Sequence, residues 1–185
     1  MLCVGTIEPR KSDSCFTGNG GGTGVGHQFR GIFVGNAGWL NGQFRTELQQ
    51  AHSRGIELEL HENISDKLLA DFYQNASLTV YCSEAKGFGL LIVESVMAGA
   101  PCLTSRLGSM KEIANQLGGY SLVIPFSTSE IPTAITRLLR NHNELAHLTT
   151  EVRQARSHTW SDYCEQIMDF VSSNTKNYPY PKIPE

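Results

Sequence analysis

YCSEAKGFGLLIVESVMAGAPCLTS, residues 81–105, is the stretch that decides the fold of this 185-residue chain. An apolar run over residues 78–81 predicts a buried strand, a Gly-Phe-Gly turn follows, and a helix is predicted to begin near Leu90 and to end at Gly99. Pro101 then opens a second short apolar strand. This order of strand, glycine turn, helix and strand is typical of a parallel α/β sheet.

The glycine turn and the helix after it form a candidate ligand site. Glycine lets the backbone approach a bound molecule closely, and the free N–H groups of a first helical turn attract an anion such as a phosphate. Glu94 lies one turn further along and faces back toward the turn, where its carboxylate would accept hydrogen bonds from sugar hydroxyls. The alternatives are an ordinary strand-to-helix turn and an acidic side chain on the helix surface.

The rest of the chain alternates short apolar strands with amphipathic helices. Strands are predicted over residues 2–5, 31–34, 57–60, 78–81, 101–104 and 121–124. Helices are predicted over residues 42–54, 66–74, 90–98, 110–116, 130–141, 143–156 and 161–172, with Ser65 or Asp66 capping the second and Ser161 the last. Because parallel strands are joined by crossover helices, the sequence predicts an α/β fold with an open, doubly wound parallel sheet of the Rossmann-like kind.

Two segments depart from this pattern. Residues 18–26 hold six glycines where the first crossover helix belongs, and each glycine costs a helix about 1 kcal/mol relative to alanine. They predict an irregular linker or a sequence error in place of the helix, since no Gly-Lys-Ser/Thr follows to favour a phosphate loop. Residues 174–185 contain three prolines and predict an extended tail after a domain over 1–173.

The strand–turn–helix unit resembles the donor-binding motif in the C-terminal domain of retaining GT-B glycosyltransferases of family 4, also called group 1. The residues that match this motif are Gly87, Phe88, Gly89, Leu90, Glu94, Gly99 and Pro101. Lys86 stands where the family has a glutamate, and Leu91 where it has a proline. Further stretches resemble the family in the same order along the chain, over residues 4–11, 33–39, 64–66 and 159–161. The resemblance therefore implies the C-terminal half of a GT-B fold.

The resemblance also implies roles for individual residues. Arg10 and Lys11 would hold the donor diphosphate and Glu94 the ribose, which makes these three the candidate catalytic residues. The candidate donor-binding residues are Gly5, Thr6, Ile64, Lys86, Gly87, Phe88, Gly89 and Leu90. A solvated charge pair is the alternative for Arg10 and Lys11, and Lys86 would either meet the diphosphate or mark lost activity.

The function that the resemblance implies is transfer of a hexose, with retention, from a nucleotide-diphosphate sugar to an acceptor. Relatives of this kind need no metal or other cofactor, because cationic side chains neutralise the leaving diphosphate. Their acceptor lies on an N-terminal domain, which we expect to be missing or separate here. The alternative is a non-catalytic nucleotide-sugar-binding remnant, or a regulatory partner of a separate acceptor-domain subunit.

Composition excludes several other classes of protein. An apolar content of 40% and a charged content of 18% are typical of a globular domain, and a net charge of −3 argues against a nucleic-acid partner. No apolar run approaches the roughly 18 residues of a membrane span, so we expect no transmembrane segment, which leaves room for peripheral membrane contact in the intact enzyme. The five scattered cysteines, without C-x-x-C spacing, favour a reducing compartment and hence a cytoplasmic location.

Overall fold

The computed structural model describes residues 1–6, 30–36, 41–83, 88–123, 130–155 and 159–174. The chain divides into two compact units, residues 1–155 and 156–185. The predicted boundary between residues 173 and 174 stays a prediction. The glycine-rich run over 18–26 and the tail beyond residue 174 lie outside the described residues.

One parallel sheet forms the centre of the first unit, with the strands in the order β3-β2-β1-β4-β5-β6. The strands are β1 (Leu2–Val4), β2 (Arg30–Val34), β3 (Glu57–His61), β4 (Thr79–Tyr81), β5 (Cys102–Ser105) and β6 (Tyr120–Val123). This is the order of a doubly wound α/β sheet, in which the chain reverses its direction of travel between β1 and β4. The predicted fold class is confirmed.

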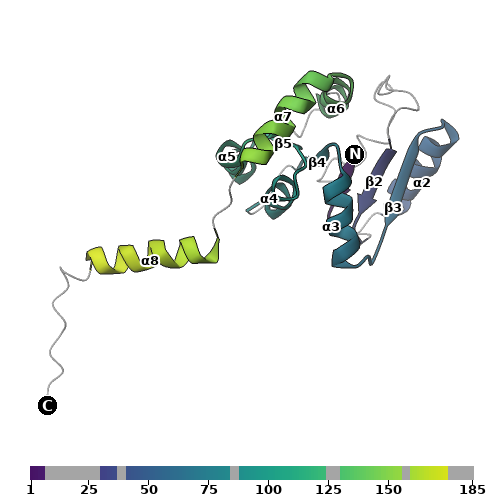
Figure 1. The fold of residues 1–185 in the computed structure, drawn as a ribbon. Coiled ribbons are helices and arrows are strands. Elements are labelled where there is room, and N and C mark those ends of the chain that lie inside the picture. Colours follow the sequence, from purple (N-terminus) through teal and green to yellow (C-terminus); the bar gives the residue numbers. More distant parts are fainter. Residues whose placement is uncertain (7–29, 37–40, 84–87, 124–129, 156–158, 175–185) are drawn as a thin grey trace, which may run out of the picture. The chain divides into compact units, whose positions relative to one another are not determined.

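Helices cover both faces of this sheet (Figure 1). They are α2 (Asn41–Ser53), α3 (Asp66–Asn75), α4 (Leu90–Met97), α5 (Gly108–Leu117), α6 (Glu130–Arg140) and α7 (His142–Gln154). Successive strand residues point to opposite faces, so Phe33 packs with α2, α6 and α7 in one cluster while Val34 packs with α3 in another. All the predicted strands and helices form, with ends within two residues of those predicted.

The second unit contains α8 (Trp160–Asn174). The predicted cap of this helix was wrong: Thr159, not Ser161, bonds to the first turn. The Asp162 N–H donates to Thr159 Oγ1 at 3.2 Å, and the Thr159 N–H donates back to Asp162 Oδ2 at 2.6 Å. This reciprocal pair is a capping box, and it starts the helix one residue before Ser161. Ser65 caps α3 as predicted, accepting from the Leu68 N–H at 3.3 Å.

No helix among the described residues combines the length and apolar character needed to cross a bilayer.

Two buried hydroxyl groups fix α4 against the sheet. Ser95 Oγ donates to the Ala100 carbonyl at 2.8 Å, and Thr79 Oγ1 lies 2.5 Å from Ser95 Oγ. Because the single hydroxyl proton of Ser95 goes to Ala100, Thr79 is the donor in the second bond. Both side chains are buried, so these bonds are made where water cannot replace them. They set the position of α4 relative to β4.

Replacing this hydroxyl tests how much the fold depends on it. We expect Ser95→Ala to lower the free energy of unfolding by about 1–3 kcal/mol, because Thr79 and the Ala100 carbonyl both lose a buried partner. Urea denaturation measures the change. Ser53→Ala is the control, since the exposed Ser53 Oγ donates to the Gln50 carbonyl at 2.8 Å and its loss should cost about 0.5 kcal/mol or less. Equal losses in the two variants would contradict this account.

Candidate functional site

The candidate site lies at the carboxyl ends of β1 and β4. These strands are neighbours, with Leu2 paired to Thr79, and the strand order reverses between them. Ligands of open α/β sheets bind in the crevice at such a reversal, beyond the carboxyl ends of the strands. Gly5 and Thr6 leave β1 at this edge of the sheet, and Ser83 leaves β4 there.

Glycine is required where β1 and β2 end. The Gly5 N–H donates to the Val34 carbonyl at 2.8 Å. A Cβ atom at Gly35 would lie 2.2 Å from the Gly5 carbonyl oxygen, so no other residue fits there without moving the backbone. The predicted donor-binding residue Gly5 therefore lies in a closely packed backbone contact beside the strand reversal.

The glycine turn begins α4 in the way its sequence predicts. Gly89 is the N-cap residue with φ +85°, in the left-handed region that other residues rarely adopt. It has no side chain to bond the N–H groups of the first turn, of which the Ile92 N–H donates to the Gly89 carbonyl at 3.0 Å. Phe88 and Leu90 on either side are 64% and 62% exposed. This arrangement suits an anionic ligand at the helix N-terminus.

Glu94 has a partner that the sequence did not reveal. The hydroxyl of Tyr73 donates to Glu94 Oε2 at 2.9 Å. Burial raises the pKa of Tyr73, and the neighbouring Glu94 charge raises it further, so the hydroxyl stays protonated and remains a donor. Tyr73 lies on the apolar side of α3, where a sequence pattern shows only a core residue. Only the fold brings it to Glu94.

A second unpredicted pair holds the ends of β4 and β5 together. The Ser83 N–H donates to Ser105 Oγ at 2.8 Å, and Ser105 Oγ donates to the Ser83 carbonyl at 2.8 Å. Both residues are fully buried. Since Ser83 precedes the segment that carries Lys86, this pair fixes the point from which that segment leaves the sheet.

The structure brings several predicted site residues to one edge of the sheet: Gly5, Thr6, Ile64, Phe88, Gly89, Leu90 and Glu94. The half-buried side chain of Ile64 packs in the apolar cluster with Leu2, Val34 and Tyr73. Its side chain is therefore structural, and any ligand contact would come from its backbone. Arg10, Lys11, Lys86 and Gly87 lie outside the described residues.

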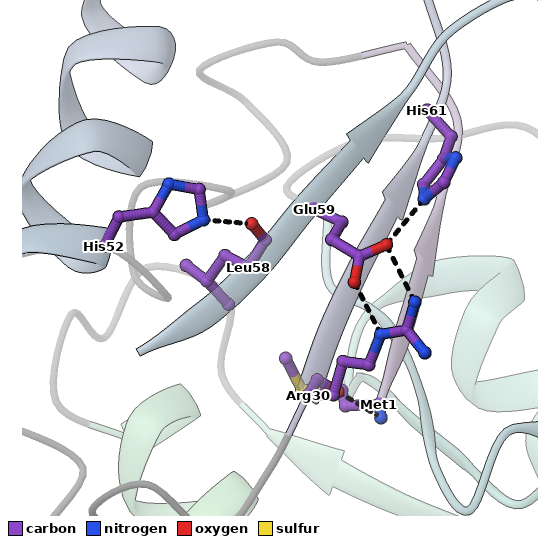
Figure 2. Close-up of polar contacts among 6 residues, drawn as sticks. All are labelled: Met1, Arg30, His52, Leu58, Glu59 and His61. Atoms are coloured by element: carbon purple, nitrogen blue, oxygen red, sulfur yellow. Dashed lines mark hydrogen bonds and ion pairs between the residues drawn. The ribbon is translucent and has the colours of Figure 1, made fainter. Parts of the chain in front are cut away.

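Polar side chains also lie on the neighbouring strands β2 and β3, as Figure 2 shows. The guanidinium of Arg30 donates to both carboxylate oxygens of Glu59, at 2.6 and 2.9 Å. His61 Nε2 lies 2.9 Å from Glu59 Oε2, and the His61 ring meets Phe72 edge-on with centroids 5.0 Å apart. Glu59 thereby holds the imidazole at the carboxyl end of β3.

These bonds predict how stability depends on pH. The Arg30 hydrogen bond, followed by that of His61, lowers the pKa of Glu59 from 4.5 to about 2. A carboxylate with a lowered pKa stabilises the fold above its unfolded pKa, and this contribution is lost as pH falls through the folded pKa. We expect Glu59→Gln to be less stable than the parent at pH 7 and to approach it between pH 4.5 and about 2.

Thermal unfolding of both proteins across this pH range measures the effect. It should be small, because the Glu59 side chain is 38% exposed and solvent screens the ion pair. Glu112→Gln, at an exposed position on α5, is the matched control and should follow the parent at every pH. A constant difference between Glu59→Gln and the parent down to pH 2 would contradict the assignment.

A cavity of about 780 Å³ opens elsewhere on the first unit. Its lining includes Met1, the residue before β1, Arg30, which begins β2, and Asn75 at the end of α3. The cavity thus lies at the amino ends of the strands, at the opposite edge from the strand reversal. Because ligands of these sheets bind at the carboxyl ends, we place the candidate site at the crevice and not in this cavity.

A family model described as glycosyl transferases group 1 matches residues 26–155. The serotype-specific mannosyltransferase WbdA of Escherichia coli is 27% identical over 155 residues, which is 82% of this chain and 18% of that protein. The MMP alpha-(1->4)-mannosyltransferase of Mycolicibacterium hassiacum is 33% identical over 86 residues, which is 46% of this chain and 21% of that protein. The chain thus spans about a fifth of the length of these relatives.

Solved structures share the fold. Anabaena HepE in complex with UDP and glucose matches with a TM-score of 0.66 and 19% identity, over 92% of this chain and 48% of HepE. The C-terminal domain of a group 1 glycosyl transferase, LpcC from Francisella tularensis, matches with a TM-score of 0.67 and 16% identity, over 96% of this chain and 86% of that domain. These neighbours are of the GT-B type, and the likeness at such low identity is one of fold.

Proposed function

Because the chain belongs to the group 1 glycosyl transferases, we propose that it binds a nucleotide-diphosphate sugar at the crevice beyond β1 and β4. It would then donate the hexose, with retention of configuration, as a family 4 enzyme and as the C-terminal half of a GT-B protein. The observation that carries the proposal is the placement of the glycine-capped α4 and of Glu94 beside the strand reversal. HepE, whose structure contains UDP and glucose, supports the choice of ligand.

The proposed roles divide between the two ends of the nucleotide sugar. Glu94 binds the ribose, and the backbone around Ile64 meets the base. The N–H groups at Gly87–Leu90 and the side chain of Lys86 face the diphosphate and the sugar. Arg10 and Lys11 neutralise the negative charge that grows on the diphosphate as the sugar leaves, an interaction that is stronger in the transition state than in the ground state. With two adjacent cations in this role, we propose transfer without a metal.

The first test of the function is nucleotide binding. We expect calorimetric titration with UDP, GDP, ADP and dTDP to detect weak binding of at least one of them. Glu94→Gln should weaken that binding by about 1–3 kcal/mol, because an amide accepts a ribose hydroxyl less well than a carboxylate. Glu57→Gln is the control, since Glu57 begins β3 at the opposite edge of the sheet. A folded sample that binds none of the four nucleotides would contradict the proposed site.

Helix α8 of the second unit supports the proposal that this domain has a partner. On α8, large apolar side chains are exposed, among them Trp160 at 82% and Phe170 at 70%. Tyr163 and Ile167 lie between them, so the spacing of three and four residues places all four along one side of the helix. We propose that this side packs on a separate acceptor-binding domain. The match to a C-terminal domain, that of LpcC, supports this choice.

The cysteines support the proposed compartment. The five cysteines are scattered along the sequence without C-x-x-C spacing, as in proteins from reducing surroundings. Cys3, Cys82 and Cys102 are buried, where cysteine packs as a small apolar side chain. We therefore propose a cytoplasmic location.

The second test of the function is transfer itself. We expect the 185-residue chain, mixed with a panel of nucleotide sugars and acceptors, to form no glycosylated acceptor in a mass-spectrometric assay. Positioning of two substrates supplies much of a transferase's rate, and the proposed acceptor surface belongs to the partner domain. Slow hydrolysis of a nucleotide sugar is the most that the chain alone should show. Transfer at ordinary enzyme rates would contradict the need for a partner.

The charge reversal at Lys86 favours a second candidate function, nucleotide-sugar binding without catalysis. The same assay distinguishes the two candidates once the acceptor domain is supplied. Transfer in the reconstituted mixture supports the enzyme, whereas binding without transfer or hydrolysis supports the non-catalytic domain.

A further inference from the structure

We propose that Tyr73 is a positioning residue for Glu94, and that it prepares one carboxylate oxygen of Glu94 to bind the ribose of the nucleotide. This inference rests on the proposed function. It assigns a role to a side chain on α3, seven residues after the start of that helix and 21 residues before Glu94 in the sequence.

The hydroxyl of Tyr73 is held in a fixed place by the core. The side chain is only 5% exposed and packs in one cluster with Leu2 of β1 and Val34 of β2. A tyrosine ring has few rotatable bonds, and a packed core permits few rotamers. Because β1 is a strand of the reversal itself, the hydroxyl keeps a constant position relative to the crevice.

The carboxylate of Glu94 needs such a partner. Glu94 lies on the exposed side of α4, where a glutamate side chain is free to adopt many rotamers. Its backbone is already fixed, because the adjacent Ser95 is hydrogen-bonded to Thr79 and to the Ala100 carbonyl. The bond from Tyr73 to Glu94 Oε2 then fixes the carboxylate as well.

Within the part of the chain that the structure describes, Tyr73 bonds to only one oxygen of the Glu94 carboxylate. A carboxylate has about four acceptor positions on its two oxygens, and Tyr73 uses one of them on Oε2. Oε1 is therefore the atom that we assign to a ribose hydroxyl. Because Tyr73 already orders the Glu94 side chain in the folded protein, ligand binding does not have to restrict its rotation. The entropy cost of ordering this side chain therefore falls on folding and not on binding.

The protonation state of Tyr73 suits this role. Burial and the charge of Glu94 both raise the pKa of Tyr73, so its hydroxyl donates at every pH at which the protein would bind a nucleotide. The hydrogen bond to an ionised acceptor is of the stronger, charge-assisted kind.

The test compares ribonucleotides with analogues that lack the ribose hydroxyls. Calorimetry would measure binding of UDP and GDP, and of 2′,3′-dideoxy-UDP and 2′,3′-dideoxy-GDP, to the parent and to Tyr73→Phe. We expect Tyr73→Phe to weaken binding of the ribonucleotide by about two- to tenfold, the cost of ordering one free side chain. The dideoxy analogue should bind the parent and the variant equally, because it makes no bond to Glu94.

Two controls separate positioning from a general structural effect. Tyr120→Phe also removes one tyrosine hydroxyl, which donates to Asn115 Oδ1 at 2.6 Å, and it should leave both affinities unchanged. In a protein that already carries Glu94→Gln, adding Tyr73→Phe should cause little further loss of ribonucleotide affinity, because the two residues act as a unit. Equal weakening of ribonucleotide and dideoxy analogue by Tyr73→Phe would show a structural role only and would overturn the inference.

The outcomes also separate this inference from the proposed function. If the parent binds a ribonucleotide and Glu94→Gln weakens it while a folded Tyr73→Phe does not, the positioning role fails and the function stands. If the parent binds no nucleotide, both fail. A crystal structure of the parent with the bound nucleotide tests the geometry even where Tyr73→Phe does not fold. Glu94 turned away from Tyr73 to reach the ribose would overturn the inference.

Discussion

The parallel pairing of β1 with β4 is the contact on which the candidate site depends. Leu2 pairs with Thr79 there, and the chain builds the sheet outward in both directions from this pair of strands. The segment after β1 and helix α4 after β4 consequently start at one strand reversal, although some 85 residues separate them. No side chain creates this juxtaposition. It follows from parallel strands that are added in opposite directions from a shared centre.

Thr79 connects this pairing to the helix that carries Glu94. Its backbone belongs to the β1–β4 ladder, while its hydroxyl bonds to Ser95 in α4. Tyr73 supplies a second connection, since it packs on Leu2 and bonds to Glu94. Helix α4 is thus bonded to the rest of the fold through two neighbouring residues, Glu94 and Ser95. These two bonds fix the rotation of α4 about its own axis. The position of a carboxylate on such a helix is set by packing in the core and not by the ligand.

Much of this architecture could be predicted from the sequence, because apolar periodicity and glycine positions are local signals. The strand at residues 79–81, the left-handed Gly89 and the start of α4 at Leu90 all follow from residues within one short stretch. Tyr73 and Ser105 could not be predicted in the same way. Their partners are Glu94 and Ser83, 21 and 22 residues away, and a buried tyrosine or serine has the same local pattern whether or not it has such a partner.

Thr159 was missed for a different reason, since two hydroxyl residues flank the start of α8 and only the hydrogen bonds distinguish them.

In the proposed site, the charge reversal at Lys86 falls on a different group of residues from those that the core fixes. Glu94 and Tyr73 belong to regular elements anchored by buried hydrogen bonds, and we assign them to the ribose of the nucleotide. Lys86, Arg10, Lys11 and the N-terminus of α4 are assigned to the diphosphate and the sugar, where charge develops during transfer. In this proposal, binding of the ribose and stabilisation of the transition state are carried by separate residues. A lysine at position 86 would then be able to abolish or redirect the chemistry while ribose binding persists, because Glu94 and Tyr73 are held by the core and not by that lysine.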